Sequence, residues 1–153
     1  MDIQRIAGLG NMPLLLVDAV VAVDQVTKEC VYQKKMELPP RPVAVQGLID
    51  TGASISVISK SLVSRLRLVS RGDCKVTGFD RTGDTPERFL NYPVSIQLFD
   101  ESGEVLLEKS EMQVISSSLP ERGYELLIGC DLLEAFQLEI NFPVGTFSLR
   151  PAR

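Results

Sequence analysis

The sequence contains no histidine and no tryptophan. Without histidine, neither a Ser-His-Asp triad nor a Cys-His pair can form within one chain. The side chain most common in catalytic zinc sites is missing for the same reason. Any hydrolytic chemistry in this chain must therefore use other groups, and we expect no metal ion and no other cofactor.

Cysteine is scarce, and its three copies, Cys30, Cys74 and Cys130, lie far apart. An odd number of widely spaced cysteines does not make a disulfide framework and is typical of a reducing compartment. Cys130 has the side chain of a nucleophile, but no histidine is present to activate it. We therefore expect free thiols without a catalytic role.

Long apolar runs and basic stripes are also missing. The apolar run from Met12 to Val23 is interrupted by Asp18, is too short to cross a bilayer, and is preceded by a single positive charge, Arg5. The net charge of −4 differs from the basic balance of nucleic-acid-binding domains. We expect a cytoplasmic protein, or a domain of a larger protein, that binds neither nucleic acid nor membranes.

What the chain does contain is typical of one globular, strand-rich domain. Its 153 residues are 44% hydrophobic and 24% charged, and nine prolines and eleven glycines separate short β-branched runs. We expect residues 1–12 to be a loose lead-in and residues 13–153 to form a single domain. Within it, residues 13–38 would be N-terminal extension strands and residues 43–150 the core.

Apolar patterning predicts strands in the first half of the chain at Leu14–Val23, Val26–Leu38 and Val43–Ile49. Residues 39–42, which include three prolines, interrupt pairing and predict a loop. Ser59 followed by Leu62 and Leu66 predicts a short helix, with Ser59 as the N-cap and the two leucines on its buried face.

The same patterning in the second half predicts strands at 73–78, Glu87–Phe99, Val105–Ile115, Leu138–Phe142 and Thr146–Leu149. The first two would form a hairpin around the glycine-bearing segment 78–84. A further apolar strand ends at Gly129. A helix would follow it, with Asp131 as N-cap and Glu134 as the capping-box partner.

The stretch Leu48-Ile49-Asp50-Thr51-Gly52-Ala53-Ser54 carries the strongest chemical signal. It places a carboxylate at the end of an apolar strand, in a tight turn that Gly52 permits. Partial burial favours the neutral form of a carboxylic acid, which suits acid–base chemistry. Asp and Gly are also ordinary turn formers, so this stretch by itself is equally compatible with a purely structural turn.

Three motifs together resemble the retropepsin-like aspartic proteases. They are Gly47-Leu48-Ile49-Asp50-Thr51-Gly52-Ala53-Ser54, the glycine-bearing hairpin, and Leu127-Ile128-Gly129-Cys130-Asp131-Leu132-Leu133, in that order. The resemblance covers roughly residues 43–150. It implies a mostly β, single-lobe closed barrel with one or two short helices. Two copies would pair so that each contributes one aspartate to a shared site beneath two flaps.

By this resemblance Asp50 is the catalytic carboxylate. The Thr51 hydroxyl would bond across the dimer axis, Gly52 would leave room for the substrate backbone and accept a hydrogen bond from it, and Ala53 and Ser54 would line the cleft. The flap that closes over an extended polypeptide would consist of Gly78, Phe79, Asp80, Arg81, Thr82 and Gly83. The resemblance gives Gly129 and Asp131 a structural role under the active-site turn.

Chain length and residue content agree with this implication. The chain has one Asp-Thr-Gly and is too short for two lobes, so a pair of aspartates must come from a symmetric homodimer. Two carboxyl groups a few Å apart cannot both ionise cheaply, so one keeps its proton while the other acts as base. Such a pair activates a water molecule without histidine or metal.

Two features of the sequence differ from the pattern of the retroviral members of this family. Residues 79–84 are more polar than a glycine-rich flap, and roughly fifty residues precede Asp50, so we expect the N-terminal strands to extend the sheet or alter the dimer interface.

Two other functions are also considered. A catalytically silent dimerisation or peptide-binding module would keep the same motifs. Phosphate-handling enzymes of the actin-like class also use Asp-x-Gly turns, but they need two large lobes that this chain cannot supply.

Overall fold

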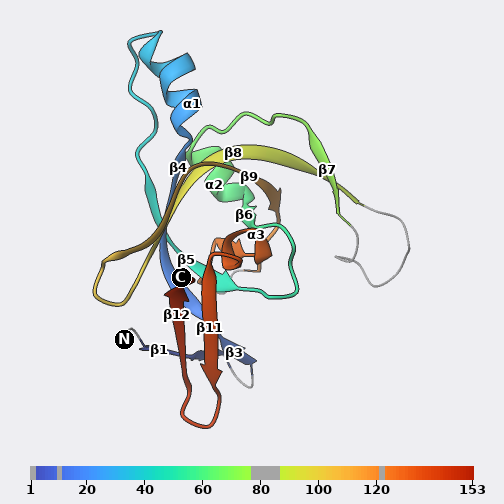
Figure 1. Ribbon diagram of the computed structural model, residues 1–153. Helices are drawn as coiled ribbons and strands as arrows, with labels where there is room; N and C mark the ends of the chain where they lie inside the picture. Colours follow the sequence, from blue (N-terminus) through green and yellow to red (C-terminus); the bar gives the residue numbers. More distant parts are fainter. Residues whose placement is uncertain (1–2, 10–11, 77–86, 121–122) are drawn as a thin grey trace.

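The computed structural model describes residues 3–9, 12–76, 87–120 and 123–153, and strands dominate it (Figure 1). The strands are β1 (Ile3–Arg5), β2 (Ala7–Leu9), β3 (Met12–Leu14), β4 (Leu16–Val23), β5 (Val43–Ile49), β6 (Val57–Ser59), β7 (Asp73–Val76), β8 (Glu87–Phe99), β9 (Val105–Ser117), β10 (Leu126–Ile128), β11 (Phe136–Asn141) and β12 (Thr146–Pro151). The helical segments are α1 (Gln25–Thr27), the π-helix η1 (Lys28–Gln33), α2 (Lys60–Arg65) and α3 (Cys130–Leu133).

Six of the strands form a closed barrel. In the order β4-β5-β10-β6-β9-β8 each strand is hydrogen-bonded to the next, and β8 pairs again with β4, which closes the sheet. The pairs β5–β10 and β6–β9 are parallel, and the other neighbours are antiparallel. The predicted mostly β, closed-barrel fold is confirmed.

Alternating burial explains why these segments form barrel strands. In β4, Val17, Ala19 and Val21 are buried while Asp18 is exposed, as expected for a strand with one face on a core. In β8, Val94, Ile96 and Leu98 alternate in the same way and line the same core cluster. The period-2 pattern is strong in both segments, and both predicted strands are present.

Residues 26–38 are an exception, because the predicted strand is wrong. Asp24 accepts a hydrogen bond from the Thr27 backbone N–H, and this cap starts α1, which continues directly into η1. Neither segment contains a buried residue. The alternation that suggested a strand therefore had no core to face, and the segment satisfies its backbone groups locally through helical hydrogen bonds. It projects from one end of the barrel (Figure 1).

The N-terminal lead-in is more ordered than the sequence predicts. Strand β1 pairs antiparallel with β12, which in turn pairs with β11, so residues 3–5 join the C-terminal hairpin in a separate three-stranded sheet. Residues 7–9 and 12–14 pair as β2 and β3. These short segments show no clear alternation in sequence. Strand β1 depends on a partner far along the chain, whereas β2 and β3 pair with each other.

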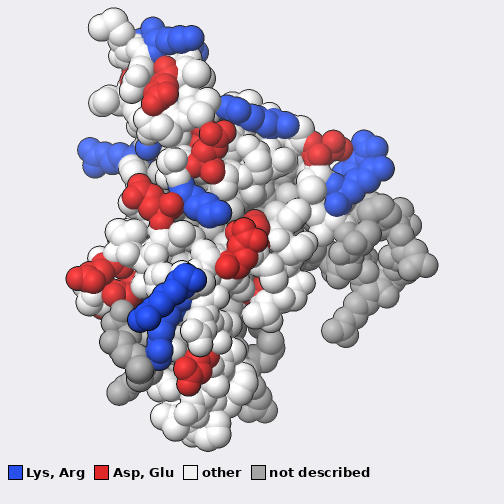
Figure 2. All heavy atoms as spheres, in the orientation of Figure 1, with Lys and Arg blue, Asp and Glu red and all other residues white. Residues whose placement is uncertain are grey.

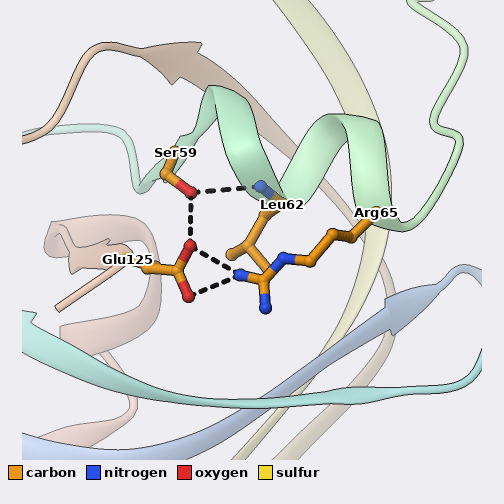
Figure 3. Close-up of polar contacts among 4 residues, drawn as sticks. All are labelled: Ser59, Leu62, Arg65 and Glu125. Atoms are coloured by element: carbon orange, nitrogen blue, oxygen red, sulfur yellow. Dashed lines mark hydrogen bonds and ion pairs between the residues drawn. The ribbon is translucent and has the colours of Figure 1, made fainter.

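Helix α2 confirms the predicted cap. The Leu62 backbone N–H donates to the Ser59 hydroxyl at 3.1 Å, and Leu62 and Leu66 are fully buried. The Ser59 hydroxyl also donates to the Glu125 carboxylate, which forms an ion pair with Arg65 (Figure 3). The helix is thereby attached to the start of β10 at both its ends.

The remaining predicted strands are present with small shifts at their ends. Strand β9 continues two residues beyond the predicted Ile115, and β11 begins two residues before the predicted Leu138. Strands β7 and β8 pair antiparallel as the predicted hairpin requires, whereas the segment that joins them lies outside the described residues. In the described part of the chain, no helix is long and apolar enough to span a membrane.

Candidate active site

Asp50 follows the last residue of β5, between two strands that hold it on either side. The Ile49 backbone N–H donates to the Leu15 carbonyl at 2.9 Å, and the Asp50 backbone N–H donates to the Ile128 carbonyl of β10 at 3.0 Å. Because β5 and β10 run parallel, these bonds continue the barrel pairing up to the aspartate itself. The position of its backbone is therefore set by the barrel.

The turn after Asp50 is closed by hydrogen bonds to this residue. Its Oδ1 accepts from the Gly52 N–H at 3.0 Å, and its carbonyl accepts from the Ala53 N–H at 3.2 Å. Asp50 is half-buried, Ala53 is buried, and Thr51 and Gly52 are exposed. The carboxylate is thus held in one orientation within a turn whose tip faces outward.

The chain segment 129–131 lies directly under this turn. The Ala53 carbonyl accepts from the Cys130 N–H at 2.8 Å, and the Ser54 carbonyl accepts from the Asp131 N–H at 3.3 Å. A Cβ atom on Gly129 would lie 2.8 Å from the Ile55 carbonyl carbon and 2.9 Å from the Ala53 oxygen, so only glycine fits here. The predicted packing of Gly129 beneath the turn that follows Asp50 is present.

Asp131 also links the segment 129–131 to the residues that follow the Asp50 turn, through hydrogen bonds to Ser56. One carboxylate oxygen accepts from the Ser56 N–H at 2.9 Å and the other from its hydroxyl at 2.6 Å. The Ser56 hydroxyl accepts in turn from the Gly129 N–H at 3.0 Å. Ser56 is fully buried, so this polar network replaces the water that these groups lose on folding.

This network corrects the predicted start of the second helix. The N-cap of α3 is Gly129, which provides no side-chain cap, and Asp131 lies in the first turn. Its carboxylate is occupied by Ser56, 75 residues away in sequence, and does not cap its own helix. Sequence reasoning missed Ser56, because a serine between apolar residues has no distinctive local pattern.

A thiol also lies beside the turn. Cys130 is exposed, and its Sγ is 3.5 Å from the Thr51 carbonyl oxygen, a weak hydrogen bond. The sequence predicts no role for this residue, and the contact adds one more link between α3 and the Asp50 turn.

Apolar side chains lie on the barrel strands close to the end of β5. In the strand register, Leu48 of β5 lies opposite Leu16 of β4 on one side and Leu127 of β10 on the other. Leu16 and Leu48 are only half-buried, and they pack against a second apolar cluster that contains Leu127. The three leucines therefore form a row across β4, β5 and β10, one residue before the end of β5 that leads into Asp50.

The remaining predicted site residues lie beside the turn or outside the described residues. Ser54 is exposed next to the turn. The proposed flap residues, Gly78, Phe79, Asp80, Arg81, Thr82 and Gly83, lie outside the described residues, so their position relative to Asp50 stays a prediction. A hollow of about 1090 Å³ lies against β4, β5 and residues 118–120 and 123–125, and Asp50 is not among its lining residues.

We looked for a metal centre in the described part of the chain. No group of three or more histidine, cysteine, aspartate or glutamate side chains there could hold a metal ion. Basic and acidic side chains are interspersed on the face shown in Figure 2.

Solved structures that match this chain include two of similar extent. A retropepsin-like aspartic protease from Rickettsia conorii matches with a TM-score of 0.48 and 14% identity, over 96% of this chain and 98% of that one. The retroviral protease-like domain of Ddi1 from Leishmania major matches with a TM-score of 0.40 and 15% identity, over 91% of this chain and 95% of that one. No protein-family model and no curated protein matches the sequence. Both TM-scores lie below 0.5, so the fold is assigned from the strand pairing described above.

Proposed function

We propose that this chain is half of an aspartic endopeptidase. Two copies would pair about a two-fold axis, and Asp50 of each would form a dyad that activates a water molecule against a peptide bond. The observation that carries this proposal is the Asp50-Thr51-Gly52 turn. A half-buried carboxylate is held there by hydrogen bonds at the end of a barrel strand, and the exposed Thr51 and Gly52 lie at its tip.

The chemistry follows from bringing two such turns together. Two carboxyl groups in contact share one proton, so one remains an acid that polarises the peptide carbonyl and the other is a base that takes a proton from water. The rigid turn supports this mechanism because the carboxylates need no rearrangement before reaction. Thr51 is assigned to hold the two turns together across the axis.

The C-terminal hairpin is a suitable surface for the second copy. The hairpin of β11 and β12 carries three exposed apolar side chains: Ile140 at the end of β11, and Phe142 and Val144 in the turn, which are 61% and 68% exposed. Exposed apolar side chains gathered in one place favour association with another protein surface. Strand β1 pairs with this hairpin, so the N-terminal segment would also lie close to the interface.

The substrate in this proposal is an extended polypeptide. Gly52, Ala53 and Ser54 would contact its backbone, residues 78–83 would cover it as a flap, and the row of Leu16, Leu48 and Leu127 would accept an apolar side chain beside the cleaved bond. The protein would therefore prefer peptides with a large apolar residue at the cleavage site.

Cleavage of an unfolded peptide library, read by mass spectrometry, tests the proposal. The native chain is expected to cut within peptides, and Asp50→Asn to reduce the rate by at least about a thousandfold, because it removes the base from both halves of the dyad. Asp18→Asn is the matched control, since it makes the same substitution at an exposed position on β4 and should cleave like the native chain.

The dependence on protein concentration provides the second part of the test. The rate per chain should fall on dilution, because a monomer carries only one of the two aspartates. A native chain that binds peptides without cutting them, and binds them equally well as Asp50→Asn, would instead be a silent peptide-binding module. Equal cleavage by native and Asp50→Asn proteins would refute the aspartate mechanism.

A further inference from the structure

The hollow of about 1090 Å³ beside β4 and β5 has a firmly held wall opposite these strands. Ser59 and Glu125 belong to this wall, and the Ser59 hydroxyl donates to the Glu125 carboxylate at 3.1 Å (Figure 3). The Ser59 backbone N–H also donates to the Glu125 carbonyl at 3.0 Å. The hollow is therefore a preformed feature between two tied parts of the barrel.

Strand β5 loses one of its two partners at this hollow. Strand β10 pairs with residues 47–49 of β5, and the Glu125 N–H adds one bond to the Gln46 carbonyl at 3.2 Å. Gly123 then has a φ of 84°, a left-handed conformation that ends the extended run of β10. Strand β4, in contrast, pairs with β5 as far as its first residue. Within the described residues, the start of β5 is therefore paired on the β4 side only.

The backbone of Ala44 faces this open side. Residues along a strand alternate in the direction of their backbone groups. The Ile49 N–H bonds toward β4, whereas the Gln46 carbonyl bonds toward β10, and Ala44 is two residues from Gln46. Ala44 is exposed and lines the hollow, and among the described residues neither its N–H nor its C=O has a partner on that side. Such an edge is a template for another strand.

Lys60 provides a positive charge at the same hollow. It is exposed, it is the only lysine or arginine among the described lining residues, and it has no ion-pair partner within the described ranges. The acidic lining residues are already engaged, because Glu125 pairs with Arg65 and Asp18 accepts a hydrogen bond from the Gln46 amide. The charge left over favours a ligand that carries a carboxylate.

We propose that this hollow binds an extended, acidic polypeptide segment as an additional strand beside β5. Ala44 would donate one backbone hydrogen bond to the segment and accept another, and a carboxylate of the segment would lie beside Lys60. Because Ala44 is small, a larger apolar side chain of the segment would reach across it to Val20, its partner on β4. The 1090 Å³ correspond to about 36 water-sized volumes, enough for the non-hydrogen atoms of about four residues.

Amide hydrogen exchange of the native protein, followed by NMR for each residue, tests the strand pairing. The probe is the acetylated and amidated pentapeptide Thr-Val-Glu-Val-Thr, which is expected to bind with a dissociation constant of about 0.1–1 mM. Saturating peptide should slow exchange of the Ala44 N–H at least about tenfold. The Val45 N–H faces β4 and should exchange slowly with and without the peptide.

Two results of this measurement would overturn the proposal. One is an exchange rate at Ala44 that does not change at saturating peptide. The other is slow exchange at Ala44 without peptide that becomes slower as the protein concentration rises, because a second copy of this chain would then cover the edge.

Variants test the two contacts separately. Ala44→Pro removes the N–H that faces the hollow and leaves the bonds to β4, so it should weaken peptide binding at least about tenfold, whereas Ala44→Thr keeps the N–H and should not. Lys60→Gln should weaken binding of the glutamate peptide about threefold and leave that of Thr-Val-Gln-Val-Thr unchanged. Lys75→Gln, at an exposed position on β7, is the matched control. The proposal fails if Ala44→Pro binds as tightly as the native chain, or if Lys60→Gln affects both peptides equally.

Asp50→Asn separates this proposal from the proposed peptidase. Asp50 does not line the hollow, so Asp50→Asn should bind the peptide and protect Ala44 as the native chain does. Failure of the peptidase proposal would leave this result intact. Loss of Ala44 protection in Asp50→Asn would place the peptide at the aspartate and refute strand addition beside β5.

Discussion

Gly129 shows how one residue without a side chain allows the candidate site to form. The atoms that a Cβ would meet there belong to the backbone of Ala53 and Ile55, which cannot rotate away. At Gly47 the nearest atom to an added Cβ is the tip of the Ile128 side chain, at 2.7 Å, which has rotamers available. The two glycines are equally buried but differ in what surrounds them.

We therefore expect Gly129→Ala to destabilise the protein by at least about 2 kcal/mol and Gly47→Ala by about 1 kcal/mol. Urea unfolding midpoints of the two variants measure the difference. Gly129→Ala should also lower any peptidase activity in the protein that remains folded, because relief of the clash displaces the Asp50 turn. Equal midpoints for the two variants would show that the backbone of residues 53–55 moves aside as easily as the Ile128 side chain.

At the scale of elements, two polar contacts hold helix α2, and we expect them to contribute unequally to the free energy of folding. The cap at Ser59 is buried, with 9% of the residue exposed, whereas the Arg65 and Glu125 side chains are 45% and 33% exposed (Figure 3). A buried cap satisfies a backbone N–H that water cannot reach, while a partly exposed ion pair competes with water and salt.

Ser59→Ala should accordingly cost about 1–2 kcal/mol of folding free energy, and Arg65→Gln less than about 1 kcal/mol. Denaturant unfolding at low and high salt measures both. Raising the salt concentration should shrink the effect of Arg65→Gln and leave that of Ser59→Ala unchanged. A larger loss from Arg65→Gln would mean that the ion pair, and not the cap, attaches the helix to β10.

At the scale of the whole molecule, self-association should depend on the C-terminal hairpin. Val144→Asp places a charge among the exposed apolar side chains of that hairpin and should weaken dimerisation at least about tenfold, because the charge must lose water at the interface. Val105→Asp, at another exposed valine, is the matched control. Analytical ultracentrifugation across protein concentrations gives both dissociation constants, and equal values would place the interface elsewhere.

The proposed dimer also predicts how cleavage would depend on pH. Its pair of Asp50 carboxyl groups would hold one proton between them. Raising the pH removes this proton and with it the acid, and lowering the pH adds a second proton and removes the base. The rate should therefore pass through a maximum on the acid side of neutral pH, as peptide-cleavage rates across a buffer series would show. A rate that stays constant from acidic to strongly alkaline solution would contradict a shared proton.

The sequence by itself determined the features that depend on neighbouring residues. Alternation in β4 and β8, the Ser59 cap, and the turn that follows Asp50 each arise from interactions a few residues apart, so their pattern is visible in the sequence. The same patterning predicted a strand-rich domain, and the resemblance to the retropepsin-like proteases implied the closed barrel.

Tertiary structure decided the features that join distant segments. Ser56 and Asp131 meet across 75 residues, β1 becomes a strand only because β12 lies beside it, and residues 26–33 are helical because no core faces them. Helix caps and alternation depend on neighbouring residues. Burial and long-range contacts depend on the tertiary fold of the whole chain, and no local sequence pattern encodes them.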